Sequence, residues 1–230
     1  FQNIPPQAKL DSITWEEKKL EYTNDDGNPR FLNSVVFSAH SRIENPTMDY
    51  YIKLSVDETV FMLPEIATKS FPPAKICYIY NYKINPKLQL FEINAGSTSV
   101  DLDAELLSKQ TNYELANVFS LKASLQSLNK ESYRFWEQIQ ILKSQSGDIT
   151  DKIPAQFSGN IKATSDLNVI GHFSIVSNST KFKLVRRAEL KNPAVLLCGA
   201  PGGPYPPRPV RECFECLFHS NASLEFPDYW

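Results

Sequence analysis

The sequence lacks a charge bias, a long apolar run and a recognisable catalytic motif. Its 24 Lys and Arg residues are matched by 26 Asp and Glu residues, which gives a net charge of -2. So small a net charge provides no whole-chain field to attract nucleic acid or an anionic membrane surface. No window approaches the roughly 18 continuous apolar residues that a membrane-spanning helix needs. Neither a polybasic nucleic-acid binder nor a helical membrane protein is indicated.

Signatures of catalysis are also missing. The three histidines, His40, His172 and His219, are far apart in the sequence, and there is no GxSxG, HExxH or glycine-rich phosphate loop. Ser, His and Asp side chains could still converge in space. We nevertheless predict a protein that is not an enzyme, with no catalytic residue, metal site or cofactor, and we interpret His172 as a strand residue.

What the sequence does have is apolar and aromatic content. With 42% hydrophobic and 12% aromatic residues, a chain of 230 residues can bury one large core or two small ones. The chain begins at Phe1, without Met, in a stretch that contains prolines. We therefore expect leading residues, including any targeting signal, to lie upstream of it.

Alternation of apolar and polar residues predicts β-strands. In residues 49–58, Tyr50, Ile52, Leu54 and Val56 fall on one face, and the same pattern recurs in residues 118–126. The other predicted strands are residues 13–22, 31–40, 75–82, 88–93, 170–176 and 181–186.

Turn-forming residues separate these strands, most clearly in residues 23–29, where Asp and Asn bond locally to the backbone and Gly27 permits a positive φ. Residues 44–47 and 84–87 are predicted turns as well. Short strands spaced in this way predict an antiparallel, immunoglobulin/fibronectin-III-like sandwich, which we expect over residues 8–190.

One segment has helical periodicity instead. Leu128, Phe135, Ile139 and Leu142 are spaced by seven, four and three residues and make one apolar stripe. We predict an amphipathic helix over about residues 129–145, with Asn129 as its cap, Glu131 at the positive end of the dipole and Gly147 at the stop. The stripe should pack on the edge or the open face of the sandwich.

Residues 191–230 form a Pro- and Cys-rich tail, which we expect to pack on the sandwich. The four cysteines are Cys77, Cys198, Cys213 and Cys216, and their even number favours two disulfides and an oxidising compartment. Connectivity stays open, with a weak preference for pairing Cys198 with one member of Cys213-Phe214-Glu215-Cys216 and Cys77 with the other. A zinc site with Cys198, Cys213, Cys216 and His219 and a redox pair are the alternatives.

Two further groups of residues were considered as sites. Asp101, Asp103 and Glu105 alternate as the start of a calcium loop would, but the central Gly and the final acid are missing, so we interpret them as a solvated acidic loop. Phe226, Tyr229 and Trp230 near the end of the chain either pack as a plug, which we favour, or are offered to a partner.

Five motifs in order resemble a known family. They are the strand and helix opening at residues 119–136, which ends in Tyr133-Arg134-Phe135-Trp136, and residues 154–161, 169–174, 213–216 and 227–230. The family is the domain of unknown function 4249, lipoproteins of Bacteroidetes-type bacteria. The resemblance is strongest over residues 119–230 and looser before them. His172 stands where members usually carry Tyr, and the Pro-rich stretch at residues 201–209 is long.

The resemblance implies a lipid-anchored protein on the surface of the outer membrane, preceded by a signal peptide, a lipid-bearing Cys and a further β domain. It also implies a neighbouring TonB-dependent outer-membrane transporter, and no catalytic residues. We therefore expect a non-enzymatic accessory or structural subunit of an outer-membrane complex that includes such a β-barrel. A free-standing carbohydrate- or peptide-binding module is the first alternative, and a zinc protein or enzyme is the second.

Overall fold

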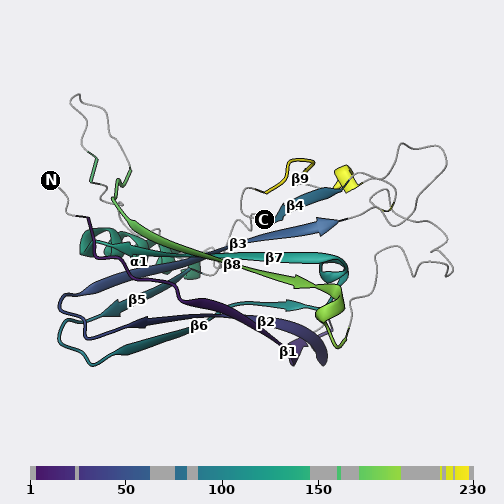
Figure 1. Ribbon diagram of the computed structural model, residues 1–230, viewed down its shortest axis with the longest axis horizontal. Coiled ribbons are helices and arrows are strands. Elements are labelled where there is room, and N and C mark those ends of the chain that lie inside the picture. Colours follow the sequence, from purple (N-terminus) through teal and green to yellow (C-terminus); the bar gives the residue numbers. More distant parts are fainter. Residues whose placement is uncertain are drawn as a thin grey trace.

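The protein, seen here as a computed structural model, is mainly β, with two antiparallel sheets packed face to face (Figure 1). The structure describes residues 4–23, 26–62, 76–81, 88–145, 160–161, 171–192, 213, 216–219 and 221–227. None of the helices in these ranges is long and apolar enough to cross a membrane.

The first sheet has the strand order β1-β2-β6. Its strands are β1 (Ser12–Thr23), β2 (Pro29–Ile43) and β6 (Val100–Gln110). A hairpin joins β1 to β2, with Gly27 at a φ of 80° where the sequence predicts a turn. Only glycine adopts such a φ without strain, so this turn is a direct consequence of the local sequence.

The second sheet has the order β8-β7-β3-β4-β9, and β5 also pairs with β3. Its strands are β3 (Tyr50–Met62), β4 (Cys77–Asn81), β5 (Gln89–Ile93), β7 (Val118–Leu128), β8 (Ser177–Arg186) and β9 (Ala222–Ser223). The chain therefore starts in the first sheet, moves to the second, returns for β6 and finishes in the second.

The core lies between the two sheets. Alternate residues of each strand point inward, and the ring of Phe37 from β2 meets the ring of Phe119 from β7 with their centroids 5.4 Å apart. Both side chains are fully buried. At about 25 cal/mol per Å² of apolar surface removed from water, such side chains supply much of the driving force for folding. The predicted inward face of β3, with Ile52 and Leu54, is confirmed.

An N-terminal segment closes one side of the sandwich. Ala8 and Leu10 are buried in the core, and their backbone N–H groups donate hydrogen bonds to the hydroxyls of Ser127 and Ser179. These bonds connect the segment to β7 and β8 of the second sheet before the chain enters β1 in the first. The segment thereby joins the two layers.

The acidic-loop interpretation of Asp101, Asp103 and Glu105 is wrong, because these residues belong to β6. Their carboxylates alternate with the buried Leu102, Ala104 and Leu106. Alternation places the acids on the solvent face of a strand, which is how carboxylates are tolerated in a half-buried sheet. The prediction of a strand at residues 170–176 is also wrong over the described residues 171–176, which have no regular structure.

The predicted helix is confirmed as α1 (Lys130–Gln145). Asn129 caps it, since its side-chain oxygen accepts a hydrogen bond of 2.8 Å from the N–H of Ser132. The helix packs against the outer face of the second sheet. Ser132 and Tyr133 are buried, and Phe135, Ile139 and Leu142 of the predicted stripe are half-buried. Gly147 lies outside the described residues.

Three short 3-10 helices complete the described structure. They are η1 (Tyr113–Leu115), η2 (Arg187–Glu189) and η4 (Cys216–Phe218). The pairing of β4 with β9 brings the described part of the tail to the edge of the second sheet, at Tyr78 and Ser223. The Pro-rich residues 201–209, the turn at 84–87, and Cys198, Tyr229 and Trp230 lie outside the described residues.

Candidate functional site

The motif at residues 169–174 contacts the motif at residues 119–136 at the start of α1. His172 stacks on Phe135, with ring centroids 4.5 Å apart and planes 11° apart, and its Nε2 lies 3.0 Å from the hydroxyl of Ser132. Ser132 is fully buried at the start of the helix. The prediction that His172 is a strand residue is therefore wrong. His172 joins an irregular segment to the helix N-terminus.

The segment that contains His172 is also held by the motif at residues 154–161. The side chain of Asn160 donates to the carbonyl of Phe173 (2.6 Å) and accepts from its N–H (2.7 Å), so one amide replaces the two bonds that a neighbouring strand would make. A Cβ atom on Gly171 would lie 2.8 Å from Cδ1 of Ile161. The glycine leaves room for the end of the Ile161 side chain, which would have to move if a Cβ were present. Asn160 and Ile161 of one motif thus pack with Gly171, His172 and Phe173 of the other, and we call this contact the joint.

Aromatic rings attach this joint to the sheet. Tyr133 of α1 packs against Tyr51 of β3 with ring centroids 5.3 Å apart, and Lys53 lies 3.6 Å above the ring of Trp136. Burial, and after it the negative charges of Glu137 and Glu92, raise the pKa of Tyr133 above its usual range. The family-like helix opening therefore has a packing role, because Tyr133 and Trp136 fix the helix to the outer face of β3.

A buried ion cluster lies between the two sheets. Nζ of Lys109, on β6, is 2.7 Å from the carboxylate of Glu58 on β3, and it also contacts the carboxylate of Glu114 on η1. The Lys109 and Glu58 side chains are only 8% and 4% exposed. Burial by itself would lower the pKa of Lys109, but the attraction of Glu58 and the contact with Glu114 outweigh it and leave the pKa raised. Lys109 is therefore a buried cation held between two carboxylates.

Local geometry explains why Lys109 points inward. The pairing of β2 with β6 shifts after Phe37, so that Leu106 is an extra residue on β6. Such a bulge reverses the facing of the residues that follow. Glu58 could have been found from the sequence, because it continues the inward positions Ile52, Leu54 and Val56. Nothing in the sequence pattern of β6 marks the bulge.

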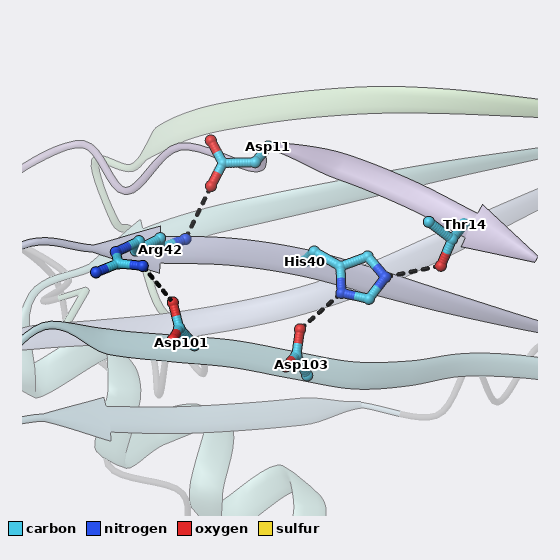
Figure 2. A network of polar contacts seen from close by, with 6 residues as sticks. All are labelled: Asp11, Thr14, His40, Arg42, Asp101 and Asp103. Atoms are coloured by element: carbon cyan, nitrogen blue, oxygen red, sulfur yellow. Dashed lines mark hydrogen bonds and ion pairs between the residues drawn. The ribbon is translucent and has the colours of Figure 1, made fainter.

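A second polar network covers the outer face of the first sheet (Figure 2). Nδ1 of His40 lies 2.6 Å from the carboxylate of Asp103, and Nε2 lies 2.7 Å from the hydroxyl of Thr14. Because an ionised carboxylate only accepts, Nδ1 donates to Asp103 and, in a neutral ring, Nε2 accepts from Thr14. Arg42 extends the network through Asp101, at 3.7 Å, and through its backbone N–H, which donates to Asp11.

The order of acid, imidazole and hydroxyl in this network resembles that of a catalytic triad. A triad also requires hydrogen-bond donors for the developing oxyanion and a site that excludes water. Here the three side chains come from neighbouring strands of a sheet face, and Asp103 is 70% exposed. We interpret the network as a set of cross-strand contacts that align β1, β2 and β6.

An open depression of about 690 Å³ lies elsewhere, where the start of β7 meets the end of β8. Its walls combine apolar side chains with two arginines. They are Phe61, Ala116, Asn117, Val118, Arg186, Arg187, Ala188 and Leu190. Nothing in the sequence marks these residues as a site, because they come from three separate segments and share no motif.

Exposed apolar side chains gather near β4 and β9. They flank the two paired strands and the short helix η4, and they include Phe226, which is 61% exposed although its ring packs edge-on against Tyr78 at 5.5 Å. We call this group the apolar edge, and it consists of Ile76, Leu217, Phe218, Leu224 and Phe226. Among the three partner-contact aromatics predicted from sequence, Phe226 is the one that the structure describes.

Cysteines also lie near the apolar edge, with Cys77 at the start of β4 and Cys216 at the start of η4. Cys77 and Cys213 are both buried, and both are disulfide-bonded. Among the described residues, no cluster of three or more His, Cys, Asp or Glu side chains could hold a metal ion. His219, a candidate zinc ligand, stacks on Tyr113 with ring centroids 6.4 Å apart.

A comparison with known families covers the residues that meet at the start of α1. Residues 1–182 match the sequence profile of the family described as Domain of unknown function (DUF4249). The chain belongs to this family. The match covers the first sheet, α1, the segments that contain Asn160, Gly171 and His172, and the second sheet as far as the first half of β8. It includes the N-terminal half, where the sequence motifs are loosest.

The DUF4249 profile ends before the cysteine-containing tail, so the apolar edge is outside the matched region except for Ile76. No curated protein and no solved structure matches the chain. The function of this DUF4249 protein is therefore inferred from its geometry and from the chemistry of its exposed residues.

Proposed function

We propose that this DUF4249 domain is the non-enzymatic, surface-exposed part of an outer-membrane lipoprotein, and that it acts as an accessory subunit of a complex with a TonB-dependent transporter. The observation that carries the proposal is the apolar edge. Its five side chains are each more than 40% exposed and lie around β4 and β9, beside the edge of the second sheet. Apolar groups that gather on a surface in this way commonly mark protein–protein contacts.

The cysteines support the proposed location. We propose that Cys77, Cys198, Cys213 and Cys216 form two disulfides in an oxidising compartment outside the cytoplasm. The disulfide-bonded state of Cys77 and Cys213 supports this proposal. Digestion of the unreduced, alkylated protein followed by mass spectrometry tests it. Disulfide-linked peptides are expected for all four residues, and an alkylated Cys77 or Cys213 would contradict it.

The anchor and the finer fold class are further parts of the proposal. We infer an upstream signal peptide, a lipid-bearing Cys and a further β domain from family membership. Two packed antiparallel sheets, between which the chain crosses repeatedly, support an immunoglobulin/fibronectin-III-like arrangement. Tyr229 and Trp230 follow Phe226 after Pro227 and Asp228 in the sequence, and we propose that they contact the same partner.

Co-purification from detergent-solubilised outer membranes tests the proposed partner. The full-length lipoprotein, tagged, should recover a TonB-dependent β-barrel in stoichiometric amount, and Phe226→Asp should reduce that recovery strongly. Phe31→Asp is the matched control, because Phe31 is 68% exposed on β2 of the other sheet. Recovery of the lipoprotein alone, or equal loss in both variants, would contradict the proposal.

The alternative is a free-standing carbohydrate- or peptide-binding module. Such a module would need a concave pocket with two or more ring faces, and the described depression contains one aromatic ring, that of Phe61. A zinc protein is the lesser alternative. A disulfide-bonded Cys213 has no thiolate to offer to zinc.

A further inference from the structure

The depression at the end of β8 is an unassigned feature with the dimensions of a ligand site. Its volume of about 690 Å³ falls within the usual range for small-molecule pockets, roughly 300 to 1,000 Å³. Phe61, Val118 and Leu190 supply apolar walls from three different segments. Leu190 is buried and Val118 is half-buried, so these walls belong to the packed body of the domain.

Arg187 is fixed at the rim of this depression. Its backbone N–H donates a hydrogen bond of 2.9 Å to the carbonyl of Asn117, which ties the end of β8 to the start of β7. Its side-chain Nε is buried and has no hydrogen-bond partner among the residues that the structure describes. A buried donor without an acceptor destabilises the folded protein. Arg187 as a whole is half-buried and lines the depression, so a small turn of its side chain would bring Nε to an acceptor bound there.

The neighbouring groups do not satisfy this donor. The nearby carboxylate of Glu189 accepts a hydrogen bond from the backbone N–H of Arg186 at 2.7 Å. None of the ion pairs among the described residues involves Arg187. Arg186 lines the same depression and adds a second positive charge. The site therefore combines an apolar floor with an excess of positive charge.

We propose that the depression binds a carboxylate that carries a short apolar group. The guanidinium of Arg187 pairs with the carboxylate, because its planar donors match the two oxygens of that group. The apolar group lies against Phe61, Val118 and Leu190. Two sources share this chemistry, a free aliphatic acid and the C-terminal residue of a peptide. The assignment is independent of the transporter partner proposed above.

The test is an NMR titration of the isolated, ¹⁵N-labelled chain with four probes. Octanoate and octanol share an apolar chain and differ in charge, and N-acetyl-Ala-Leu with a free carboxylate is compared with its C-terminal amide. Octanoate or the peptide acid should shift the amide signals of residues 61, 116–118 and 186–190. The octanol and amide probes should bind at least about tenfold more weakly, because they lack the charge that Arg187 recognises.

Three variants make the test specific. Arg187→Gln removes the recognising cation, and Arg30→Gln is its control, because Arg30 is an exposed arginine on β2. Ala188→Trp fills the depression from an exposed position and tests the site even if Arg187→Gln does not fold. Binding should weaken by about tenfold or more in Arg187→Gln and Ala188→Trp and stay unchanged in Arg30→Gln.

The outcomes separate the possibilities. Tighter binding of the peptide acid assigns the site to chain termini, and tighter binding of octanoate assigns it to free aliphatic acids. Equal binding of the charged and neutral probes would overturn the proposal. Signal shifts that leave residues 61, 116–118 and 186–190 unaffected, or no shift at all, would overturn it too.

Discussion

Lys109 and Glu58 form an ion pair across the interior of the sandwich, with Nζ 2.7 Å from Oε2 and both side chains almost fully buried. One residue comes from β6 of the first sheet and the other from β3 of the second. The ring of Phe119 lies 5.0 Å from the same Nζ. The pair therefore connects the two sheets next to the contact between Phe37 and Phe119. Its loss should lower the free energy of unfolding of the whole domain.

Replacement of Lys109 by Ala should destabilise the fold by about 3–5 kcal/mol, because it removes the buried cation that pairs with the carboxylates of Glu58 and Glu114. Urea denaturation measures the change. The double variant Lys109→Met with Glu58→Leu should recover most of the loss, since neither buried position then carries a charge and the remaining carboxylate, that of Glu114, is 23% exposed. Lys18→Ala is the control, because its pair with Glu16 is exposed and should cost less than about 1 kcal/mol. Equal losses for Lys109→Ala and Lys18→Ala would contradict this account.

Stability should fall at alkaline pH. The folded-state pKa values of Lys109 and Tyr133 are raised above their ordinary values of 10.5 and 10.0. Above pH about 10 the unfolded chain releases these protons more readily than the folded one, so unfolding becomes more favourable. The stability that these groups provide is complete below pH 10 and is lost as the pH rises through the folded values. Denaturation between pH 7 and 11 measures this, and Tyr133→Phe should flatten the decline. A decline of unchanged steepness in Tyr133→Phe would argue against a contribution from this residue.

The cap of α1 should contribute measurably to stability. Asn129→Ala removes the side-chain acceptor for the N–H of Ser132 and should cost about 1 kcal/mol. Asn129→Ser retains an acceptor and should cost much less. Thermal unfolding of both variants, followed by circular dichroism, distinguishes a capping role from simple loss of volume. Similar melting temperatures for Ala and Ser would speak for the latter.

Asn160 should anchor the segment that contains His172. Its side chain is hydrogen-bonded to both the N–H and the carbonyl of Phe173, so Asn160→Ala should destabilise the domain by about 1–2 kcal/mol. Hydrogen exchange gives a local readout, because the Phe173 amide should exchange faster in the variant. Asn178→Ala is the matched control, since Asn178 is exposed and its side chain bonds the hydroxyl of Thr180. An unchanged exchange rate at Phe173 would refute the anchoring role.

The regular elements could be predicted from the sequence because their signals are local. Alternation in residues 49–58 and 118–126 predicted β3 and β7, and helical spacing with Asn129 as the cap predicted α1. β6 was missed because its outward residues are all acidic in the first half, and a run of alternating carboxylates is also typical of a calcium loop. The apolar Leu102, Ala104 and Leu106 between them are what identify the strand.

The sequence by itself determined the mainly β character, the cap of α1, the turn at Gly27 and the family, because each of these depends on residues that are close in the chain or on motifs in a fixed order. Tertiary structure alone decided three further things: which strands share a sheet, that a bulge turns Lys109 toward Glu58, and that Arg187 meets Phe61 around one depression. Each of these depends on contacts between segments many residues apart. Such contacts are fixed by packing of the whole core, which no local pattern records.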